Sequence, residues 1–377
     1  MNKKLKKVIV GISATIGAVL AIVVSYVGYV LIQYHRIADN QILEITKRSD
    51  MAIDKNNSYR IATYNIGFGA YRPDYSFFMD EGYMADGTKV VGKSSRAVSK
   101  ESVIESTNGV IEEIKKQDVD FIFYQEVDTD STRSYHVDQC QIITDSFNKY
   151  DYNFAVNYHS AYLFYPFTEP IGKSNSGVLT LSKYKIDLAI RKAYPISDSF
   201  DKFFDLDRCF SVSRMSVGDK ELVLVNSHMS AYDKGGYIRA KQIDMMKTFC
   251  QEEINKGNYL IYGGDFNHDL LKNNPQYQYE EGERPEWMNF TQLKPDWLAS
   301  IDYENDLVAH MVPAVSDNIP TCRDADLPLI GYENDLYKSV IDGFMVSDNI
   351  EIISVTNIDN GFEYSDHQPV VLEFKFK

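Results

Sequence analysis

Sequence signatures of several enzyme classes are missing from this chain of 377 residues. It has no G-x-S-x-G motif, no P-loop and no G-x-G-x-x-G motif, so neither a serine-hydrolase nucleophile nor a nucleotide-binding loop is indicated. The cysteines show no C-x-x-C spacing, which argues against zinc and thioredoxin-type sites. Outside the cell they allow one or two disulfides, with three full pairings open. The four cysteines are Cys140, Cys209, Cys250 and Cys322.

Basic residues are scarce outside the N-terminus. The chain has 39 Lys and Arg against 54 Asp and Glu, and residues 1–37 contain five of the basic residues and no acid. The remainder therefore has 34 basic and 54 acidic residues, a net charge of −20. Because nucleic-acid binding depends on Lys and Arg that face phosphates, we expect no general nucleic-acid-binding surface. A local, metal-bearing pocket for a phosphate ester stays compatible with this charge.

Residues 1–37 differ from the rest of the chain. Four lysines between residues 3 and 7 precede an uncharged run over residues 8–32. At ~1.5 Å per residue, roughly 25 residues can cross a ~30 Å hydrocarbon core. No small-residue cleavage site follows the run, which favours an uncleaved membrane anchor over a cleaved signal peptide. By the positive-inside rule, the N-terminus is then cytoplasmic, and the rest of a single-pass chain lies outside the cell membrane.

The remaining residues form a polar connector, 38–57, and one patterned segment, 58–377. About ten apolar runs predict strands, and apolar residues at helical spacing predict helices. The helices are expected near residues 97–117, 138–150 and 235–254. Residues 273–335 are rich in Pro, Asn and aromatics and are expected to form long loops. We therefore predict one α/β domain in which two sheets pack face to face between helices.

Polar side chains stand where most of these predicted strands begin or end. They are Asn65, Glu126, His228, Asp265, Asn267, Asp342, Asp366 and His367. Any one of them alone is more often a turn or cap residue. Because the strands of packed sheets end near one another, the repeated pattern predicts that the set converges on one rim of the domain.

The stretch "YGGDFNHDLL", residues 262–271, first suggests a calcium loop of the EF-hand type. That loop needs Gly at its sixth position and Glu at its twelfth, where this chain has Leu270 and Gln276. The stretch is therefore interpreted as a strand that delivers Asp265 and Asn267 to the rim. Its paired glycines are expected to let the backbone approach a substrate.

Three members of the set provide hard oxygen ligands. Glu126, Asp366 and the amide oxygen of Asn65 suit Mg²⁺ rather than zinc, with Mn²⁺ or Ca²⁺ as alternatives. An ion held in this way keeps several waters and binds a substrate phosphate. Phosphate-ester cleavage also needs an oriented water and compensation of charge on the phosphate oxygens.

Other members of the set can orient the water and donate hydrogen bonds to the phosphate oxygens. His228 and His367 can donate to phosphate oxygens, and Asp265 can orient or deprotonate water. Asp342, beside a histidine, fixes its tautomer and stabilises its imidazolium. The pattern therefore indicates hydrolysis of a phosphate ester.

The motifs "YNIGFG", "FYQEVD", "NSHMSAY", "GGDFN", "IDGFMVSDN" and "SDHQPVVLEF" occur in the order found in one known group of enzymes. From about Tyr59 to Lys377 the chain resembles the endonuclease/exonuclease/phosphatase superfamily, which includes pancreatic deoxyribonuclease and neutral sphingomyelinases. The resemblance implies a four-layer α/β/β/α sandwich and Mg²⁺-dependent phosphoester hydrolysis. It also implies a role for each residue of the set. Asn65, Glu126 and Asp366 serve the metal, His228 the phosphate, Asp265 the water, Asn267 a phosphate oxygen, and Asp342 pairs with His367.

Arg133 and Arg323 are further candidates for substrate binding, although a solvated or structural arginine is the commoner case. Three substrates stay open: a lipid phosphodiester, slightly favoured by the anchor; a nucleic acid, disfavoured by charge; and a phosphomonoester. The alternative outside the enzymes is a binding module on the cell surface that has no catalytic activity. No obligate protein partner is evident.

Overall fold

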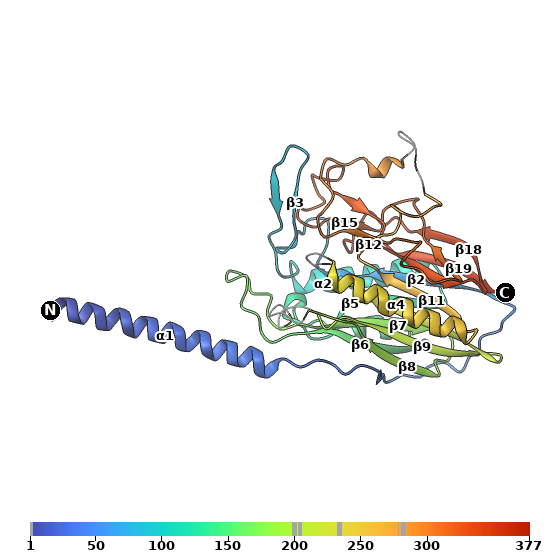
Figure 1. The fold of residues 1–377 in the computed structure, drawn as a ribbon, viewed down its shortest axis with the longest axis horizontal. Coiled ribbons are helices and arrows are strands. Elements are labelled where there is room, and N and C mark those ends of the chain that lie inside the picture. The colour runs from blue at the N-terminus through green and yellow to red at the C-terminus, as the bar shows by residue number, and fades with distance from the viewer. Residues whose placement is uncertain (1–2, 198–201, 203–205, 232–235, 278, 280–283) are drawn as a thin grey trace.

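The computed structural model describes residues 3–377 except 198–201, 203–205, 232–235, 278 and 280–283. Two β-sheets pack face to face, and helices lie against their outer faces (Figure 1). These four layers confirm the predicted α/β sandwich.

The two large sheets have seven and six strands and are mainly antiparallel. In spatial order, the larger sheet contains β1 (Gln41–Ile42), β8 (Leu188–Ala193), β9 (Cys209–Val217), β10 (Lys220–His228), β11 (Tyr259–Asp265), β17 (Asp342–Ser347) and β14 (Met311–Ala314). The smaller sheet contains β18 (Ile350–Asn357), β19 (Val370–Phe376), β2 (Ser58–Asn65), β5 (Phe121–Asp128), β7 (Asn175–Ser182) and β6 (Asp151–His159). Two neighbouring pairs are parallel, β10 with β11 and β2 with β5.

Three helices cover the sheets, as the periodicity predicted. α2 (Lys100–Lys116) and α3 (Gln139–Ser146) pack on the smaller sheet, and α4 (Tyr237–Asn255) packs on the larger one. The side chain of Ser99 accepts a hydrogen bond from the Ser102 amide and caps the start of α2, and Asp138 caps α3 in the same way. The helices thus begin where a polar residue satisfies free amide groups.

The main core lies between the sheets. Ile61 and Phe123 from the smaller sheet and Leu224, Ile261 and Phe344 from the larger one belong to one buried apolar cluster. Because helices cover the outer faces, the inner strands are buried on both sides, and all seven residues of β11 are buried. This explains the unbroken apolar runs in the sequence.

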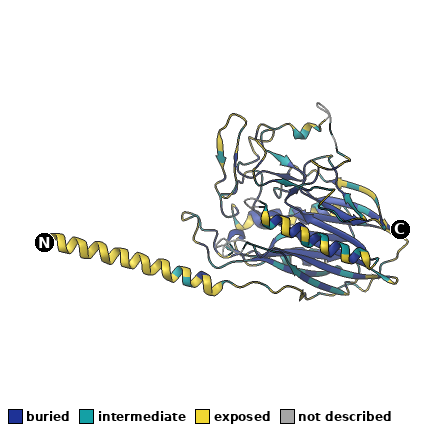
Figure 2. Ribbon diagram, viewed as in Figure 1, coloured by how far each residue is buried: buried dark blue, intermediate teal, exposed yellow. Residues whose placement is uncertain are grey.

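The N-terminal helix α1 (Lys3–Gln33) extends away from the sandwich (Figure 1). Nearly all of its residues are exposed (Figure 2), and its most apolar window has a mean hydropathy of 2.5. Its length and composition are those of a membrane-spanning helix. The orientation of such an anchor stays a prediction.

Some features were not expected from the sequence. Part of the predicted connector joins the domain, because β1 pairs with β8 and Leu43 lies in the main core. The region 273–335 forms mostly loops among its described residues, but it adds β14 to the larger sheet. All four cysteines are free thiols. The remaining short elements are β3 (Glu81–Tyr83), β4 (Lys89–Val91), β12 (His268–Asp269), β13 (Ala299–Ser300), β15 (Cys322–Arg323), β16 (Lys338–Ser339) and the 3₁₀ turns Gly67–Gly69, Thr132–Ser134 and Glu286–Met288.

The sheet topology brings several strand ends to one rim. In register, Asn65 at the end of β2 lies opposite Gln125 of β5, and His228 at the end of β10 lies opposite Asp265 of β11. Asp265 in turn lies opposite Asp342, the first residue of β17. The rim therefore collects polar side chains from segments that are far apart in the sequence.

Candidate active site

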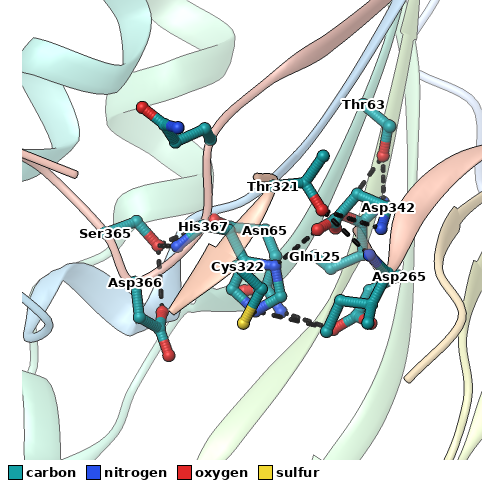
Figure 3. Close-up of polar contacts among 12 residues, drawn as sticks. Thr63, Asn65, Gln125, Asp265, Thr321, Cys322, Asp342, Ser365, Asp366 and His367 are labelled. Atoms are coloured by element: carbon teal, nitrogen blue, oxygen red, sulfur yellow. Dashed lines mark hydrogen bonds and ion pairs between the residues drawn. The ribbon is translucent and has the colours of Figure 1, made fainter. Parts of the chain in front are cut away.

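Asp265 is the centre of the polar cluster on this rim. Asn65 Nδ2 donates a 2.9 Å hydrogen bond to Asp265 Oδ2. The Nε2 atoms of His228 and His367 lie 3.5 and 3.8 Å from the same oxygen. Figure 3 shows Asn65, Asp265 and His367 converging from different segments. The predicted convergence of these residues is present in the structure.

Asp342 and His367 form a buried carboxylate–histidine pair. Asp342 Oδ2 lies 2.8 Å from His367 Nδ1, and both side chains are almost inaccessible to solvent. The Asp342 amide donates to Thr321 Oγ1 at 3.1 Å, which fixes the start of β17 (Figure 3). The pair turns His367 Nε2 toward Asp265, as expected for an oriented imidazole.

Glu126 lies on a β-bulge. The register of β5 against β7 shifts between Tyr124 and Val127, and Glu126 has a φ of +55°. That left-handed conformation is unfavourable for a residue other than glycine, and such strain often marks functional positions. The bulge directs the half-buried carboxylate to the rim, where Glu126 Oε1 lies 3.4 Å from Asn65 Nδ2 and 4.0 Å from His228 Nε2.

Asp366 lies beside the same cluster. Ser365 Oγ donates to Asp366 Oδ1 at 3.2 Å (Figure 3). Burial raises the pKa of Asp366, His367 and Arg323 lower it, and the Glu126 carboxylate raises it again. The Glu126 and Asp366 carboxylates are therefore close enough to repel each other.

The titrating groups of the cluster are strongly perturbed. Burial raises the pKa of Asp265 to about 7; His367 opposes this shift and Asp342 adds to it. Burial lowers the pKa of His228 well below its usual value, so its imidazole is neutral at pH 7. Burial is the largest single effect on His367 and opposes its charged form, but Asp342, Cys322 and Asp366 together outweigh burial and raise the pKa well above the usual value. Near neutral pH, a base and an imidazolium therefore lie side by side.

One group of three side chains among the described residues is close enough to hold a metal ion. It consists of Asp265, Asp342 and His367, whose ligating atoms lie within 4.8 Å of one another. In this group, however, the 2.8 Å contact between Asp342 and His367 already engages one ligating atom of each. Glu126 and Asp366, the hard-oxygen ligands expected from the sequence, both line the cavity at this rim, and a Mg²⁺ ion between them stays a prediction.

Asn65 has its amide nitrogen, not its oxygen, toward the carboxylates. Its Oδ1 accepts from the Gly67 amide at 3.0 Å, while Nδ2 faces Asp265 and Glu126. In this arrangement Asn65 positions the two carboxylates. A direct bond from its oxygen to a metal needs the opposite amide orientation and stays a prediction.

Asn267 follows Asp265 in a left-handed conformation with a φ of +49°, which asparagine tolerates better than most residues. Its amide N–H donates to Asp265 Oδ1 at 2.8 Å, and its Nδ2 donates to the Met229 carbonyl at 2.8 Å. The second N–H of this side-chain amide has no partner among the described residues.

The two glycines before Asp265 do not serve the substrate as expected. A Cβ on Gly264, which has a φ of +132°, would lie 2.0 Å from the Ser227 carbonyl oxygen. A Cβ on Gly263 would lie 2.2 Å from the Phe344 ring. The glycines therefore allow β11 to pack against β10 and β17, and that correction replaces the predicted contact with substrate.

The predicted arginines line the cavity at this rim, which has a volume of about 1050 Å³. Arg133 is held by two hydrogen bonds to Asp128, at 2.8 and 3.1 Å, and lies 3.8 Å from the Phe68 ring centroid. The terminal nitrogens of Arg323 donate to backbone carbonyls, including that of Tyr71. Both guanidinium groups thus have protein partners, but Arg323 Nε has none among the described residues. Substrate binding by either arginine stays a prediction.

Arg208 was missed in the sequence. It lines the same cavity, it is 5% exposed, and its Nε and Nη1 have no hydrogen-bond partner among the described residues. Asn157 and Ser176 line the same cavity, and the Asn157 amide nitrogen and the Ser176 hydroxyl likewise have no hydrogen-bond partner among the described residues. Arg208 directly precedes β9. The other site residues were selected because they are polar groups at strand boundaries, and Arg208 meets the same criterion.

A polar layer supports the site from below. Gln125 Nε2 donates to Asn226 Oδ1 at 2.8 Å and to Thr63 Oγ1 at 3.1 Å (Figure 3 labels Thr63 and Gln125). These buried side chains belong to both sheets, so their hydrogen bonds fix the two sheets relative to each other beneath the rim.

Comparisons with known proteins agree with this geometry. The sequence model of the Endonuclease/Exonuclease/phosphatase family matches residues 62–367. No curated protein sequence matches the chain. Among solved structures, an endonuclease/exonuclease/phosphatase family protein from Leptotrichia buccalis C-1013-b is 16% identical with a TM-score of 0.53; the alignment covers 84% of this chain and 100% of that one.

Two further structures share the architecture. The endonuclease/exonuclease/phosphatase from Beutenbergia cavernae DSM 12333 is 14% identical with a TM-score of 0.50, and the alignment covers 85% of this chain and 72% of that one. D. rerio TDP2 complexed with single strand DNA product is 11% identical with a TM-score of 0.51, at 85% and 99% coverage. At these identities the likeness shows the fold alone. The family match extends over most of the sequence, and the chain therefore belongs to the endonuclease/exonuclease/phosphatase family of phosphate-ester hydrolases.

Proposed function

We propose that the chain is a membrane-anchored phosphoesterase that uses a divalent metal, Mg²⁺, to hydrolyse a phosphodiester or phosphomonoester with water. The observation that carries the proposal is the contact of Asp265 with Asn65, His228 and His367, at 2.9 to 3.8 Å. A carboxylate with a pKa of about 7 next to an imidazolium is an arrangement suited to acid–base chemistry at neutral pH.

Glu126 and Asp366 are proposed to hold the metal, and Asn65 to keep Glu126 in place. The repulsion between the two carboxylates supports this assignment, because a cation between them removes it. When bound, the ion stabilises negative charge on the phosphate oxygens and the leaving group.

The protein's own residues then divide the remaining work. Asp265 accepts a proton from the attacking water or orients it. His367, kept charged by Asp342, donates a hydrogen bond or proton to a phosphate oxygen. The free N–H of Asn267 and a neutral His228 supply further donors to the phosphate.

Arg208 is proposed as an additional phosphate ligand. Its guanidinium is buried beside His228, whose pKa it lowers, and two of its nitrogens have no partner among the described residues. Burying an unpaired charge is unfavourable, so an anionic substrate group is a fitting partner. Arg133 and Arg323 act as structural neighbours of this subsite.

The anchor and the charge of the domain bear on the substrate. α1 has the length and composition to tether the domain to a membrane, and the lysines before it favour a cytoplasmic N-terminus with the catalytic domain outside. The net charge of −20 disfavours a long nucleic acid. A lipid-type phosphate ester is therefore preferred.

The test uses the full chain in detergent micelles. Bis(p-nitrophenyl) phosphate, p-nitrophenyl phosphate, sphingomyelin and plasmid DNA are each assayed with Mg²⁺ and with EDTA. We expect metal-dependent turnover of at least one substrate and its loss in Asp265→Ala and His367→Ala. The matched control is His310→Ala, since His310 is an exposed histidine that pairs with a carboxylate and does not line the cavity. Full activity in the Asp265 and His367 variants contradicts the site, and no turnover of any substrate favours the binding-module alternative.

A further inference from the structure

An exposed aromatic loop connects β6 and β7. Phe164, Tyr165 and Phe167 are 51%, 64% and 86% exposed. No residue from 161 to 168 is charged, although the domain as a whole is strongly acidic. Large apolar side chains gathered on a surface in this way usually contact a partner or a lipid bilayer.

The protein holds this loop in a defined conformation. Glu169 Oε2 accepts from the Ser95 amide at 2.8 Å, and Arg96 Nε donates to the Pro170 carbonyl at 2.6 Å. Leu163 and Gly172 exchange two backbone hydrogen bonds of 3.1 Å across the base of the loop. The exposure of the aromatic tip is therefore a property of the fold.

The loop contacts the N-terminal helix. Tyr26 Oη donates to the Tyr162 carbonyl at 3.2 Å, and the Tyr162 amide donates to Tyr29 Oη at 3.1 Å. The rings of Tyr26 and Phe164 pack edge to face with centroids 5.4 Å apart. Three contacts thus join the aromatic loop to the last turns of α1.

The position of these contacts along α1 determines how deep in the bilayer they lie. About 20 residues span a ~30 Å hydrocarbon core, so a span that begins at Val8 ends near Val27. Tyr26 and Tyr29 then lie at the outer membrane–water interface, where tyrosine is enriched. A side chain that packs against Tyr26 lies at the same depth.

We propose that the aromatic loop inserts into the outer interface of the bilayer beside α1, so that the domain rests on the membrane. Phe164 and Phe167 supply the apolar contacts, and Tyr165 places its hydroxyl among the headgroups. This inference rests on the proposed membrane anchor.

The loop also forms part of the cavity wall. Tyr158 and Ile171, on either side of the loop, line the same cavity as Glu126 and Asp265. When the tip contacts lipid, this wall of the cavity lies at the membrane surface. The substrate we infer is accordingly a phosphate ester carried by a lipid, which reaches the metal site from the bilayer.

The first experiment measures depth without reference to catalysis. The full chain is reconstituted into phosphatidylcholine vesicles that contain lipids brominated near the headgroup, and tryptophan is introduced by Phe167→Trp. The control is Ile353→Trp, because Ile353 is 45% exposed on β18, on the side of the domain away from α1 (Figure 1). The native protein provides the background of its two tryptophans. We expect quenching at position 167 and none at 353; equal signals at both positions overturn the proposal.

The second experiment tests access to the cavity. Phe164→Ser combined with Phe167→Ser is expected to lower the turnover of a lipid diester in vesicles at least tenfold and to leave bis(p-nitrophenyl) phosphate hydrolysis unchanged. An equal loss on both substrates means that the loop only supports the fold and refutes the access route. Quenching at position 167 without turnover of either substrate supports the membrane surface and refutes the proposed hydrolase activity.

Discussion

Asp342→Asn tests the buried carboxylate–histidine pair most directly. The variant keeps the shape of the side chain but removes the charge that lies 2.8 Å from His367 Nδ1. At an effective dielectric constant of about 20, opposite charges about 4 Å apart attract by about 4 kcal/mol. Because asparagine still forms a hydrogen bond, we expect a loss of about 2–4 kcal/mol in transition-state stabilisation, which is roughly 30- to 1000-fold in kcat.

The pH dependence gives the sign of the effect. The raised pKa of His367 means that its imidazolium persists at neutral pH and is lost as the pH rises through that pKa. In Asp342→Asn the alkaline loss of activity is therefore expected at lower pH. The assay is kcat and KM for bis(p-nitrophenyl) phosphate from pH 5 to 10, a range that includes the pKa of Asp265 at about 7.

A second carboxylate–histidine pair provides a matched control. Asp348 Oδ2 lies 2.7 Å from His310 Nδ1, but both side chains are more than half exposed. Such pairs contribute about 0–1 kcal/mol, so Asp348→Asn should leave kcat and the pH profile unchanged. If Asp342→Asn changes kcat less than threefold, or if it only lowers the melting temperature, the proposed role of the pair is wrong.

Three further variants test the metal site, the strand packing and a buried ion pair. Glu126→Gln should weaken Mg²⁺ binding at least tenfold in calorimetry while the melting temperature without metal stays within a few degrees; unchanged Mg²⁺ affinity removes Glu126 from the metal site. Gly264→Ala should destabilise the fold by about 3 kcal/mol or more in urea unfolding, because the new Cβ clashes with a backbone oxygen; a loss below 1 kcal/mol contradicts the packing argument. Burial opposes ionisation of Glu253, but hydrogen bonds from Arg214 and neighbouring groups lower its pKa from 4.5 to about 2. The stability that ionised Glu253 adds is complete above about pH 4.5 and falls as the pH drops toward 2. Glu253→Gln should therefore lower the free energy of unfolding by up to about 3 kcal/mol at pH 7 and by little at pH 2. A loss that does not change with pH refutes this link between the pKa and stability.

The sequence predicted the fold well where pattern and burial agree. The spacing of Val103, Val110 and Ile114 identified α2, and the unbroken run before Asp265 identified a strand covered on both faces. β1 and β14 were missed because each is short and gains its order from a neighbouring strand rather than from its own residues.

The candidate site was predictable in its membership and less so in its geometry. The position of polar residues at strand ends selected Asp265, His367 and Glu126 from the sequence. The bulge that strains Glu126 and the amide orientation of Asn65 could not be predicted from the sequence, because both depend on contacts between strands. Arg208 was missed for a related reason: only the fold shows that two nitrogens of its buried guanidinium have no partner among the described residues.

The structure of the rim explains why the pKa values of its titrating groups are so strongly shifted. Asp265 and His228 are buried at the edge of the core between the two sheets, and such burial is unfavourable for charged and polar groups. The polar layer around Gln125 and Asn226 ties the two sheets together below the rim, so the side chains cannot move apart to relieve repulsion. A metal ion beside Glu126 and Asp366 would reduce the repulsion between these carboxylates, and a phosphate would pair with the two Arg208 nitrogens that have no partner among the described residues. Both features are expected of the proposed site for a metal-bound phosphate ester.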